Sequence, residues 1–404
     1  MRFFSFSFLI AAGAALGHLY LYLRLVRPLF PSGVGRRAAA GVMIAVTVLL
    51  LLRRSLRDVL SEPARDLYLA ASYTWLAVLT ALVLATAAVD LFALALRRPL
   101  HRKRDASATV GAAAPAPSID EGRRALTRAL PLTAVGGGLV TAGYGRWRAM
   151  TPPEVTERAI RIARLPKALD GLTIVQLTDI HVGPFIERRF VEELVRRTNA
   201  LKPDLVAITG DLVDGSVAHL GNAVAALGGL QARWGSFFVT GNHDYSSGEV
   251  EWSLFLERLG IGVLRNRAVS IGDAHGNARM DLLGVDDWSG ARRGRQGYDL
   301  DAALSGLHDD TAKVLLAHQP ANFDEAAERG IDLQVSGHTH GGQIFPMTQF
   351  IHFAWDHVAG LYAAPAQNGH GIGAQIFVSR GCGFWGPPMR LNAPPEIAKL
   401  VLTV

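Results

Sequence analysis

The sequence has very little cysteine and little charge. A single cysteine in 404 residues excludes an intramolecular disulfide framework and a zinc site built from thiolates. Only 19% of the residues are charged and 50% are hydrophobic, which excludes a chain that is disordered over most of its length. The length is well above that of an ordinary domain, so we expect at least two structural units.

The net charge of +6 is divided unequally along the chain. Residues 1–150 contain 19 Lys and Arg against 7 Asp and Glu, whereas residues 151–404 contain 22 against 28, together with eleven of the thirteen histidines. The basic part is also the apolar part, which indicates contact with a membrane. We therefore expect a lipid bilayer as a partner and no nucleic acid, and the sequence points to no particular protein partner.

The first 96 residues contain three apolar runs. A helix needs about 20 apolar residues to cross the hydrocarbon core of a bilayer, and we expect three spans within residues 1–96, at 3–23, 38–52 and 68–96. Asp90 lies near the end of the third run and is expected to pair with an arginine at the membrane edge.

The next segments connect these spans to the rest of the chain. Residues 97–128 are a basic linker rich in proline and alanine. Residues 129–150 are a fourth, shorter span or a signal-like segment, since they follow the pair Arg123-Arg124. Residues 151–404 are expected to form a separate domain.

The charges of the loops indicate the orientation in the membrane. Lys and Arg collect in cytoplasmic loops, and with four spans the first and third loops would hold twelve of them against seven on the opposite side. This places residues 151–404 outside the cytoplasm. If residues 129–150 do not span, the domain lies at the cytoplasmic face.

Residues 151–404 alternate short β-rich runs with amphipathic helical stretches. We predict two helices, at 187–200 and 249–259, and five buried strands, at 172–177, 205–209, 237–240, 313–317 and 333–336. This alternation is typical of a layered α/β fold. In such folds ligands bind beside the carboxyl ends of the strands.

Polar motifs follow all five predicted strands: TDIH, GDLVD, GNHD, AHQP and GHTH. They supply seven candidate metal ligands, which are Asp179, His181, Asp211, Asn242, His318, His338 and His340. Nitrogen and oxygen donors in this number suit two divalent transition metal ions, Mn, Fe or Zn, bridged by one carboxylate. Gly210, Gly241 and Gly337 fit turns at which the backbone approaches the metals.

The ordered set D-x-H, G-D-x-x-D, G-N-H-D, H and G-H-x-H resembles the calcineurin-like metallophosphoesterase superfamily. The stretches LPKALDGLTIVQLTDIHVG and SRGCGFWGPPMRLNAPPEI further resemble its membrane-attached bacterial branch. The resemblance implies a four-layer α/β/β/α sandwich preceded by transmembrane helices. It assigns Asp179, His181, Asp211 and His340 to one ion and Asn242, His318 and His338 to the second, with Asp211 as the bridge. It also implies that His243 assists the leaving group and that Asp214 orients the ring of His243.

The resemblance implies a membrane-anchored phosphoesterase that hydrolyses a phosphate ester or pyrophosphate, with a lipid-linked substrate, by attack of a metal-activated water. Two alternatives stay open. One is a UDP-2,3-diacylglucosamine pyrophosphate hydrolase of lipid A biosynthesis, whose cytoplasmic substrate conflicts with the expected orientation. The other is a non-catalytic metal-dependent binding module.

Several residues of the C-terminal region invite further hypotheses. Arg380 and Arg390 are candidates for binding the substrate phosphate. Phe384 and Trp385 are expected to pack in the core rather than to form an apolar rim, and Cys382 is assigned no chemistry.

Overall fold

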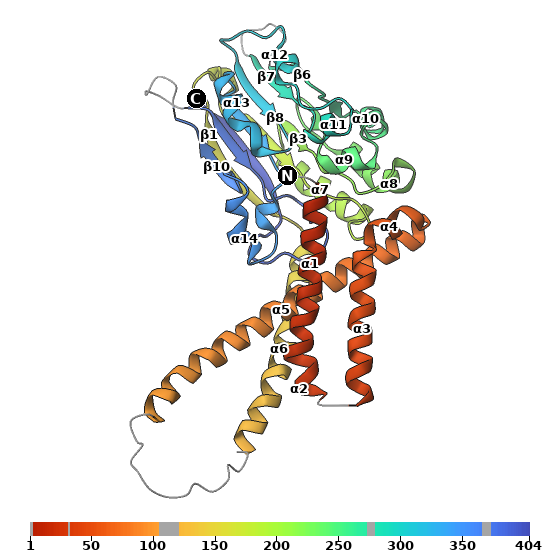
Figure 1. Cartoon of the computed structure of the whole chain (residues 1–404). Coiled ribbons are helices and arrows are strands. Elements are labelled where there is room, and N and C mark those ends of the chain that lie inside the picture. Colours follow the sequence, from red (N-terminus) through yellow and green to blue (C-terminus); the bar gives the residue numbers. More distant parts are fainter. Residues whose placement is uncertain (1–2, 31–32, 105–120, 273–278, 366–372) are drawn as a thin grey trace, which may run out of the picture. The chain divides into compact units, whose positions relative to one another are not determined.

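The protein consists of two compact units, Met1–Trp147 and Arg148–Val404 (Figure 1). The computed structural model describes residues 3–30, 33–104, 121–272, 279–365 and 373–404. Each unit is described by itself below.

The described residues of the first unit are helical. The helices are α1 (Phe3–Leu21), η1 (Tyr22–Val26), α2 (Arg27–Leu29), α3 (Val34–Leu51), α4 (Arg53–Val59), α5 (Glu62–Arg104) and α6 (Glu121–Met150). Two segments, Val34–Leu51 and Pro63–Ala95, are long and apolar enough to cross a membrane. They contain most of the predicted runs 38–52 and 68–96, and α1 covers most of the run 3–23. The number of spans stays a prediction.

The segment predicted as a linker, residues 97–128, is partly helical. Helix α5 continues to Arg104 and α6 begins at Glu121, while residues 105–120 lie outside the described part of the chain. The ends of this segment are rich in Arg, which has high helix propensity. The role of residues 97–128 as a linker stays a prediction.

Polar contacts join α1 and η1 to α5 within the helical unit. Asp90 forms an ion pair with Arg24, whose Nε lies 2.7 Å from the carboxylate, and it accepts a hydrogen bond of 2.7 Å from the Tyr20 hydroxyl. The arginine partner expected for Asp90 thus comes from an earlier helical segment. The ring of His18 is buried and lies 2.8 Å from both the Ala14 carbonyl and Trp75 Nε1.

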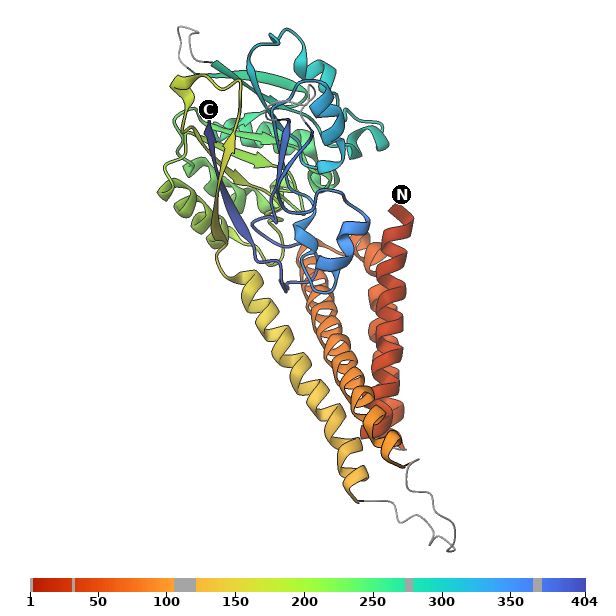
Figure 2. The ribbon, with the colours of Figure 1, turned by 90° about the vertical axis from the view of Figure 1, so that its left-hand side faces the viewer.

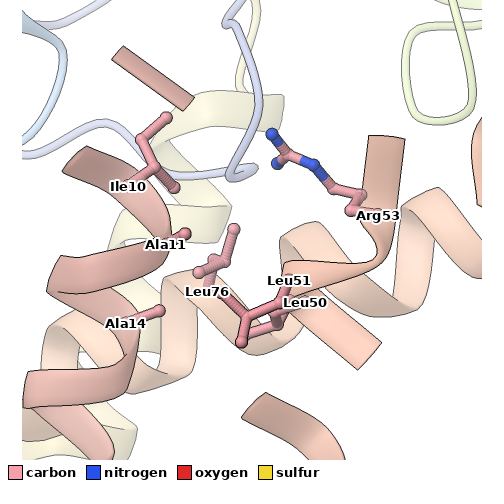
Figure 3. A pocket seen from close by; sticks show the side chains of 7 residues that line it. All are labelled: Ile10, Ala11, Ala14, Leu50, Leu51, Arg53 and Leu76. Atoms are coloured by element: carbon pink, nitrogen blue, oxygen red, sulfur yellow. The ribbon is translucent and has the colours of Figure 1, made fainter. Parts of the chain in front are cut away.

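A small pocket lies among α1, α3, α4 and α5 of the helical unit (Figure 3). Its volume is about 50 Å³, and Arg53 is the only charged residue that lines it. The remaining lining residues are Ile10, Ala11, Ala14, Leu50, Leu51 and Leu76. The pocket contains none of the candidate metal ligands.

The second unit contains two six-stranded sheets. The first has the order β1 (Glu154–Arg161), β12 (Glu396–Thr403), β2 (Thr173–Leu177), β3 (Leu205–Thr209), β4 (Ser236–Val239) and β5 (Gly262–Val263). The second has the order β10 (Gly360–Ala363), β11 (Gln375–Val378), β9 (Leu333–Ser336), β8 (Ala312–Leu316), β7 (Arg279–Gly284) and β6 (Arg267–Gly272). The five predicted strands are confirmed as β2, β3, β4, β8 and β9, each within one residue at either end.

The two sheets pack face to face and helices cover their outer faces. Ile174 of β2 packs in a core that it shares with Val314 and Val335 of the second sheet. The next residue, Val175, points to the opposite face and packs with Leu194 of α7. Leu315 of β8 likewise packs against helical residues on the outer face of the second sheet. This arrangement confirms the predicted four-layer α/β/β/α sandwich.

The helices of this unit are short and lie in the connections between strands. The α-helices are α7 (Arg188–Ala200), α8 (Val217–Val224), α9 (Asn242–Ser247), α10 (Glu249–Arg258), α11 (Ser289–Arg292), α12 (Leu300–Leu304), α13 (Phe323–Glu328) and α14 (Met347–Phe350). The 3₁₀ turns are η2 (Lys167–Leu169), η3 (Ala225–Gly229), η4 (Pro320–Asn322), η5 (His340–Gly342) and η6 (Ile351–Phe353). Both predicted helices, 187–200 and 249–259, are present as α7 and α10.

Candidate metal centre

The loops that leave β2, β3, β4, β8 and β9 converge at one edge of the two sheets. Strands β2, β3 and β4 are parallel to one another, as are β8 and β9, so their carboxyl ends lie at common edges. The structure groups the side chains there into three potential metal-binding sets, each with ligand atoms within 4.8 Å of one another. The sets are Asp179, His181 and His340; His181, Asp211 and His243; and Asp211, His318 and His338.

Asp211 lies at the junction of these sets. Its Oδ2 atom is 3.8 Å from His181 Nε2 and 3.3 Å from His318 Nε2. A carboxylate between two groups of imidazoles is the arrangement expected of a ligand that bridges two ions. On one side, His340 Nε2 lies 3.3 Å from Asp179 Oδ1.

Pairs of imidazole nitrogens also approach one another. His181 Nε2 lies 3.2 Å from His340 Nε2, and His338 Nδ1 lies 3.1 Å from His318 Nε2. His318 Nδ1 donates a hydrogen bond of 2.8 Å to the Thr209 carbonyl, so Nε2 is the nitrogen of this ring that lies at the meeting point. Nitrogen atoms that face each other in this way are suited to share a cation.

Asn242 provides an independent test of whether the residues fit a metal. Its Oδ1 atom is buried and has no hydrogen-bond partner among the residues that the structure describes. A buried carbonyl oxygen without a partner is costly, and coordination to a cation would satisfy it. The side-chain oxygen of Asn242 is therefore in the state expected of a metal ligand, and the donor set as a whole fits divalent metal ions.

The backbone at the ligands adopts an unusual conformation. Five of the seven candidates have positive φ: Asp179 at 52°, His181 at 54°, Asp211 at 49°, His338 at 71° and His340 at 52°. Residues other than glycine seldom adopt this left-handed region, although Asp, Asn and His do so more often than most. Such strain persists only where the surrounding structure holds it, and it gathers at functional sites.

Two of the motif glycines permit close approach of the chain to the ligands. A Cβ atom on Gly241 would lie 2.3 Å from the amide nitrogen and Oδ1 of Asp211. A Cβ atom on Gly337 would lie 2.2 Å from Asp179 Oδ2. Any side chain at these positions would displace a ligand carboxylate, which is the physical reason for glycine there.

His243 lies beside the ligands with Asp214 behind it. Its backbone amide donates a hydrogen bond of 2.8 Å to Asp211 Oδ1, and its Nδ1 is 2.5 Å from Asp214 Oδ1. The second oxygen of Asp214 is 3.2 Å from His181 Nδ1. Asp214 thus contacts two imidazole rings at once, and its contact with Nδ1 leaves Nε2 as the nitrogen of His243 that is available for chemistry.

The electrostatics separate the histidines into different protonation states. Burial lowers the pKa of His243, but the charges of Asp214 and Asp211 outweigh it and raise the pKa to about 9. Burial and the neighbouring His318 lower the pKa of His338 to about 4. His338 is therefore neutral at pH 7, as a metal ligand must be. Burial lowers the pKa of His318, but the charge of Asp211 outweighs it and raises the pKa well above its ordinary value, so a metal ion held by His318 must displace a proton. In the same metal-free state His243 is protonated, the form that can donate a proton.

A second buried carboxyl supports the loop after β3. Asp244 accepts hydrogen bonds from the amides of Leu212 (2.9 Å) and Gly241 (2.8 Å). Burial and the nearby charge of Asp211 raise the pKa of Asp244 to about 7. Asp244 thereby ties the loop that carries Asp211 to the loop that carries Asn242.

The two arginines expected to bind phosphate have structural partners. Arg390 is fully buried, and its guanidinium donates to the carbonyls of His340 (2.9 Å) and Gly383 (3.0 Å) and lies 3.1 Å from His340 Nδ1. This burial contradicts direct contact between Arg390 and a substrate, because the guanidinium is used to hold the ligand loop. Arg380 is partly exposed and forms an ion pair of 2.8 Å with Glu396.

Core packing was expected for both Phe384 and Trp385, and it is confirmed for Phe384 only. Phe384 is buried in the core between the first sheet and its helices, together with Cys382. Trp385 is only half-buried, and the centroid of its ring is 5.8 Å from that of His243. Trp385 therefore lies against the proposed proton donor instead of packing in the core.

Sequence reasoning missed two residues near the ligands. Asp287 follows β7 in the second sheet, is buried, and accepts a hydrogen bond of 2.8 Å from Gln319, the neighbour of His318. Trp355 lies with its ring centroid 5.0 Å from that of His338. The adjacent carboxylates Asp286 and Asp287 after a strand could have identified the first; nothing in the sequence singles out Trp355.

Comparisons with known proteins show which family and which proteins resemble this chain. The family model described as calcineurin-like phosphoesterase matches residues 172–342, the stretch that contains all seven candidate ligands. The chain is 39% identical over 295 residues to a "Transmembrane protein with metallophosphoesterase domain" of Bos taurus, covering 70% of this chain and 64% of that protein.

Bacterial relatives are matched over more of their own length. The identity is 36% over 268 residues to an "Uncharacterized metallophosphoesterase" of Helicobacter pylori, covering 65% of this chain and 68% of the relative. It is 31% over 280 residues to the "Uncharacterized metallophosphoesterase YkuE" of Bacillus subtilis, covering 67% and 93%. By contrast, the chain spans less than two thirds of the transmembrane relatives from Bos taurus and Danio rerio, 64% and 60% respectively.

Proposed function

This chain belongs to the calcineurin-like phosphoesterase family, and from that premise we propose that it is a membrane-anchored hydrolase of a lipid-linked phosphate ester or pyrophosphate. The observation that carries the proposal is the position of Asp211, whose carboxylate lies between His181 and His318. Ligands arranged around a shared carboxylate are suited to two adjacent ions, which is the centre that phosphoryl transfer to water requires.

Different residues of the chain would bind the metal ions and donate the proton. Asp179, His181, Asp211 and His340 would hold one ion, and Asp211, Asn242, His318 and His338 the other. The two ions, when bound, neutralise the phosphoryl oxygens and acidify a water molecule. Nε2 of His243 donates its proton to the leaving oxygen. Asp214 keeps the Nδ1 side of that ring occupied and stabilises the protonated imidazole.

A substrate screen tests the activity. The purified full chain, loaded with Mn, Fe or Zn, is given soluble aryl phosphate monoesters and diesters, long-chain lipid phosphates and lipid-linked pyrophosphates, including UDP-2,3-diacylglucosamine. We expect hydrolysis of at least one lipid substrate, loss of turnover after chelation, and recovery when metal is returned. Absence of turnover with every substrate and metal would favour the non-catalytic binding module, although such a module has no need of the His243–Asp214 pair.

The orientation in the membrane is part of the same proposal. The loop charges favour an extracytoplasmic domain, and a periplasmic or surface-exposed lipid phosphate fits that side. A reporter enzyme that is active only outside the cytoplasm, fused after Thr151, is expected to be active. A reporter that works only inside the cell would reverse the orientation and favour the cytoplasmic lipid A precursor as substrate.

A further inference from the structure

An uncharged, aromatic segment borders the metal centre. Residues 344–355 contain no Asp, Glu, Lys or Arg. Four of their large apolar side chains are exposed: Phe345 (47%), Met347 (53%), Phe350 (55%) and Phe353 (88%). We call residues 345–353, which include α14 and η6, the apolar lip. The surfaces of soluble proteins seldom carry contiguous apolar patches of this kind, and such patches mark contact sites.

Both ends of the apolar lip are fixed to the metal centre. At its beginning, Phe345 follows η5, which contains His340, and its amide donates to the Leu391 carbonyl at 3.0 Å. Just after its end, the ring of Trp355 lies against that of His338, with 5.0 Å between centroids. The lip is therefore a rim of the site and not a distant patch.

The chain also enters this unit at the edge that carries the ligands. Glu154, the first residue of β1, is in register with Glu396 of β12, and Ala398 of β12 is in register with Gln176 of β2. The beginning of β1 is thus level with the end of β2, where Asp179 follows. Figures 1 and 2 show β1 beginning, and α14 lying, at the end of this unit opposite α12.

The connection at that edge is short. Residues 148–153 separate the helical unit, which ends at Trp147, from β1. Even fully extended, they span at most roughly 25 Å. The helical unit of the same chain contains two helices apolar enough to cross a bilayer, which makes a lipid surface the natural occupant of the apolar lip.

These observations indicate which partner contacts the apolar lip. We infer that the apolar lip inserts into the surface of the lipid bilayer and presents the metal centre to phosphate groups at headgroup depth; the inference rests on the proposed function and specifies how its lipid substrate reaches the site. Aromatic side chains favour the membrane interface. The absence of charged side chains removes the cost of burying them there.

A fluorescent label tests the insertion without requiring activity. The only cysteine, Cys382, is fully buried, so an NBD label can be directed to Phe353→Cys in the full chain. The matched control is Leu254→Cys on α10, an apolar residue that is 52% exposed. In vesicles of phosphatidylcholine and phosphatidylglycerol, we expect blue-shifted emission and quenching by doxyl-labelled lipid at position 353 but not at 254.

Kinetic measurements provide a second test of membrane insertion. The double variant Phe350→Ser/Phe353→Ser is expected to lose about tenfold or more in kcat/KM for a lipid phosphate in vesicles, with turnover of a soluble aryl phosphate unchanged. Leu254→Ser should change neither. Equal solvent exposure of the two labels, or disulfide crosslinking between copies at position 353, would overturn the inference. Failure of the unaltered, metal-loaded chain to hydrolyse any substrate would refute the proposed function instead, because the labels report independently of turnover.

Discussion

Replacement of His243 by alanine should separate metal binding from proton donation. The ring of His243 meets Asp214, whereas its backbone amide makes the contact of 2.8 Å with Asp211. His243→Ala removes the ring and keeps the amide. The ligand carboxylate therefore stays in place, and we expect the variant to bind two metal ions per chain, as the unaltered protein does.

The expected loss of turnover follows from the protonation state. Asp214 favours the protonated form of the His243 ring, which is the form that can donate a proton to the leaving oxygen. General acid catalysis contributes about 10²–10⁴-fold, or ~3–5 kcal/mol of barrier. The loss should be larger for an alkyl phosphate, whose leaving oxygen is basic, than for a nitrophenyl phosphate, whose leaving group departs without a proton.

Two measurements decide the outcome. Metal content is measured by mass spectrometry, and kcat/KM is measured with both leaving groups. Ser246→Ala is a matched control on the same helix, α9, and should leave both quantities unchanged. Equal turnover of His243→Ala with both substrates would remove His243 from the mechanism, and loss of one metal equivalent would make it a ligand.

Three further results are expected. Asp211→Asn should lose both ions, because its carboxylate lies between two ligand groups, whereas His340→Ala should lose only one. The metal content of the two variants distinguishes these outcomes, and equal losses would refute the bridging role of Asp211. Gly241→Ala should lower stability by about 1–3 kcal/mol and reduce metal content, since its Cβ would lie 2.3 Å from Asp211; an unchanged thermal midpoint would contradict this. In the metal-free protein, the His243 ring should titrate in NMR near pH 9. Its pKa is raised, so the stabilisation it provides is complete below about pH 6.5 and is lost as pH rises through 9; titration near 6.5 would show that Asp214 does not hold the ring.

The sequence predicted the elements whose side chains have a simple period or a motif. Strands such as Leu205–Thr209 are buried on both faces and read as continuous apolar runs. The ligands follow such strands directly, so parallel pairing within each sheet and the face-to-face packing of the two sheets bring them together. Strand β12, which pairs with both β1 and β2, comes from the far end of the chain, and no local pattern shows that it lies between these two strands.

The parts of the site that were missed depend on tertiary packing. Arg390 looked like a phosphate ligand because arginine is common in such sites, but it is fully buried and donates hydrogen bonds to the carbonyls of His340, Arg380 and Gly383. Trp355 lies seventeen positions after His338 in the sequence, and only the fold brings the two rings together. The residue type indicates what chemistry each side chain can perform. Which partners it contacts depends on how the loops fold.

The left-handed backbone at five of the ligands has a consequence for engineering. Each such residue costs about 1–3 kcal/mol, so the five together store an amount comparable to the net stability of an entire domain. A designer who copied only the seven side chains onto ordinary turns of another α/β protein would aim the donor atoms in the wrong directions. To transplant this centre, the loops must be moved whole, together with the glycines and the buried Asp244 that hold their shape.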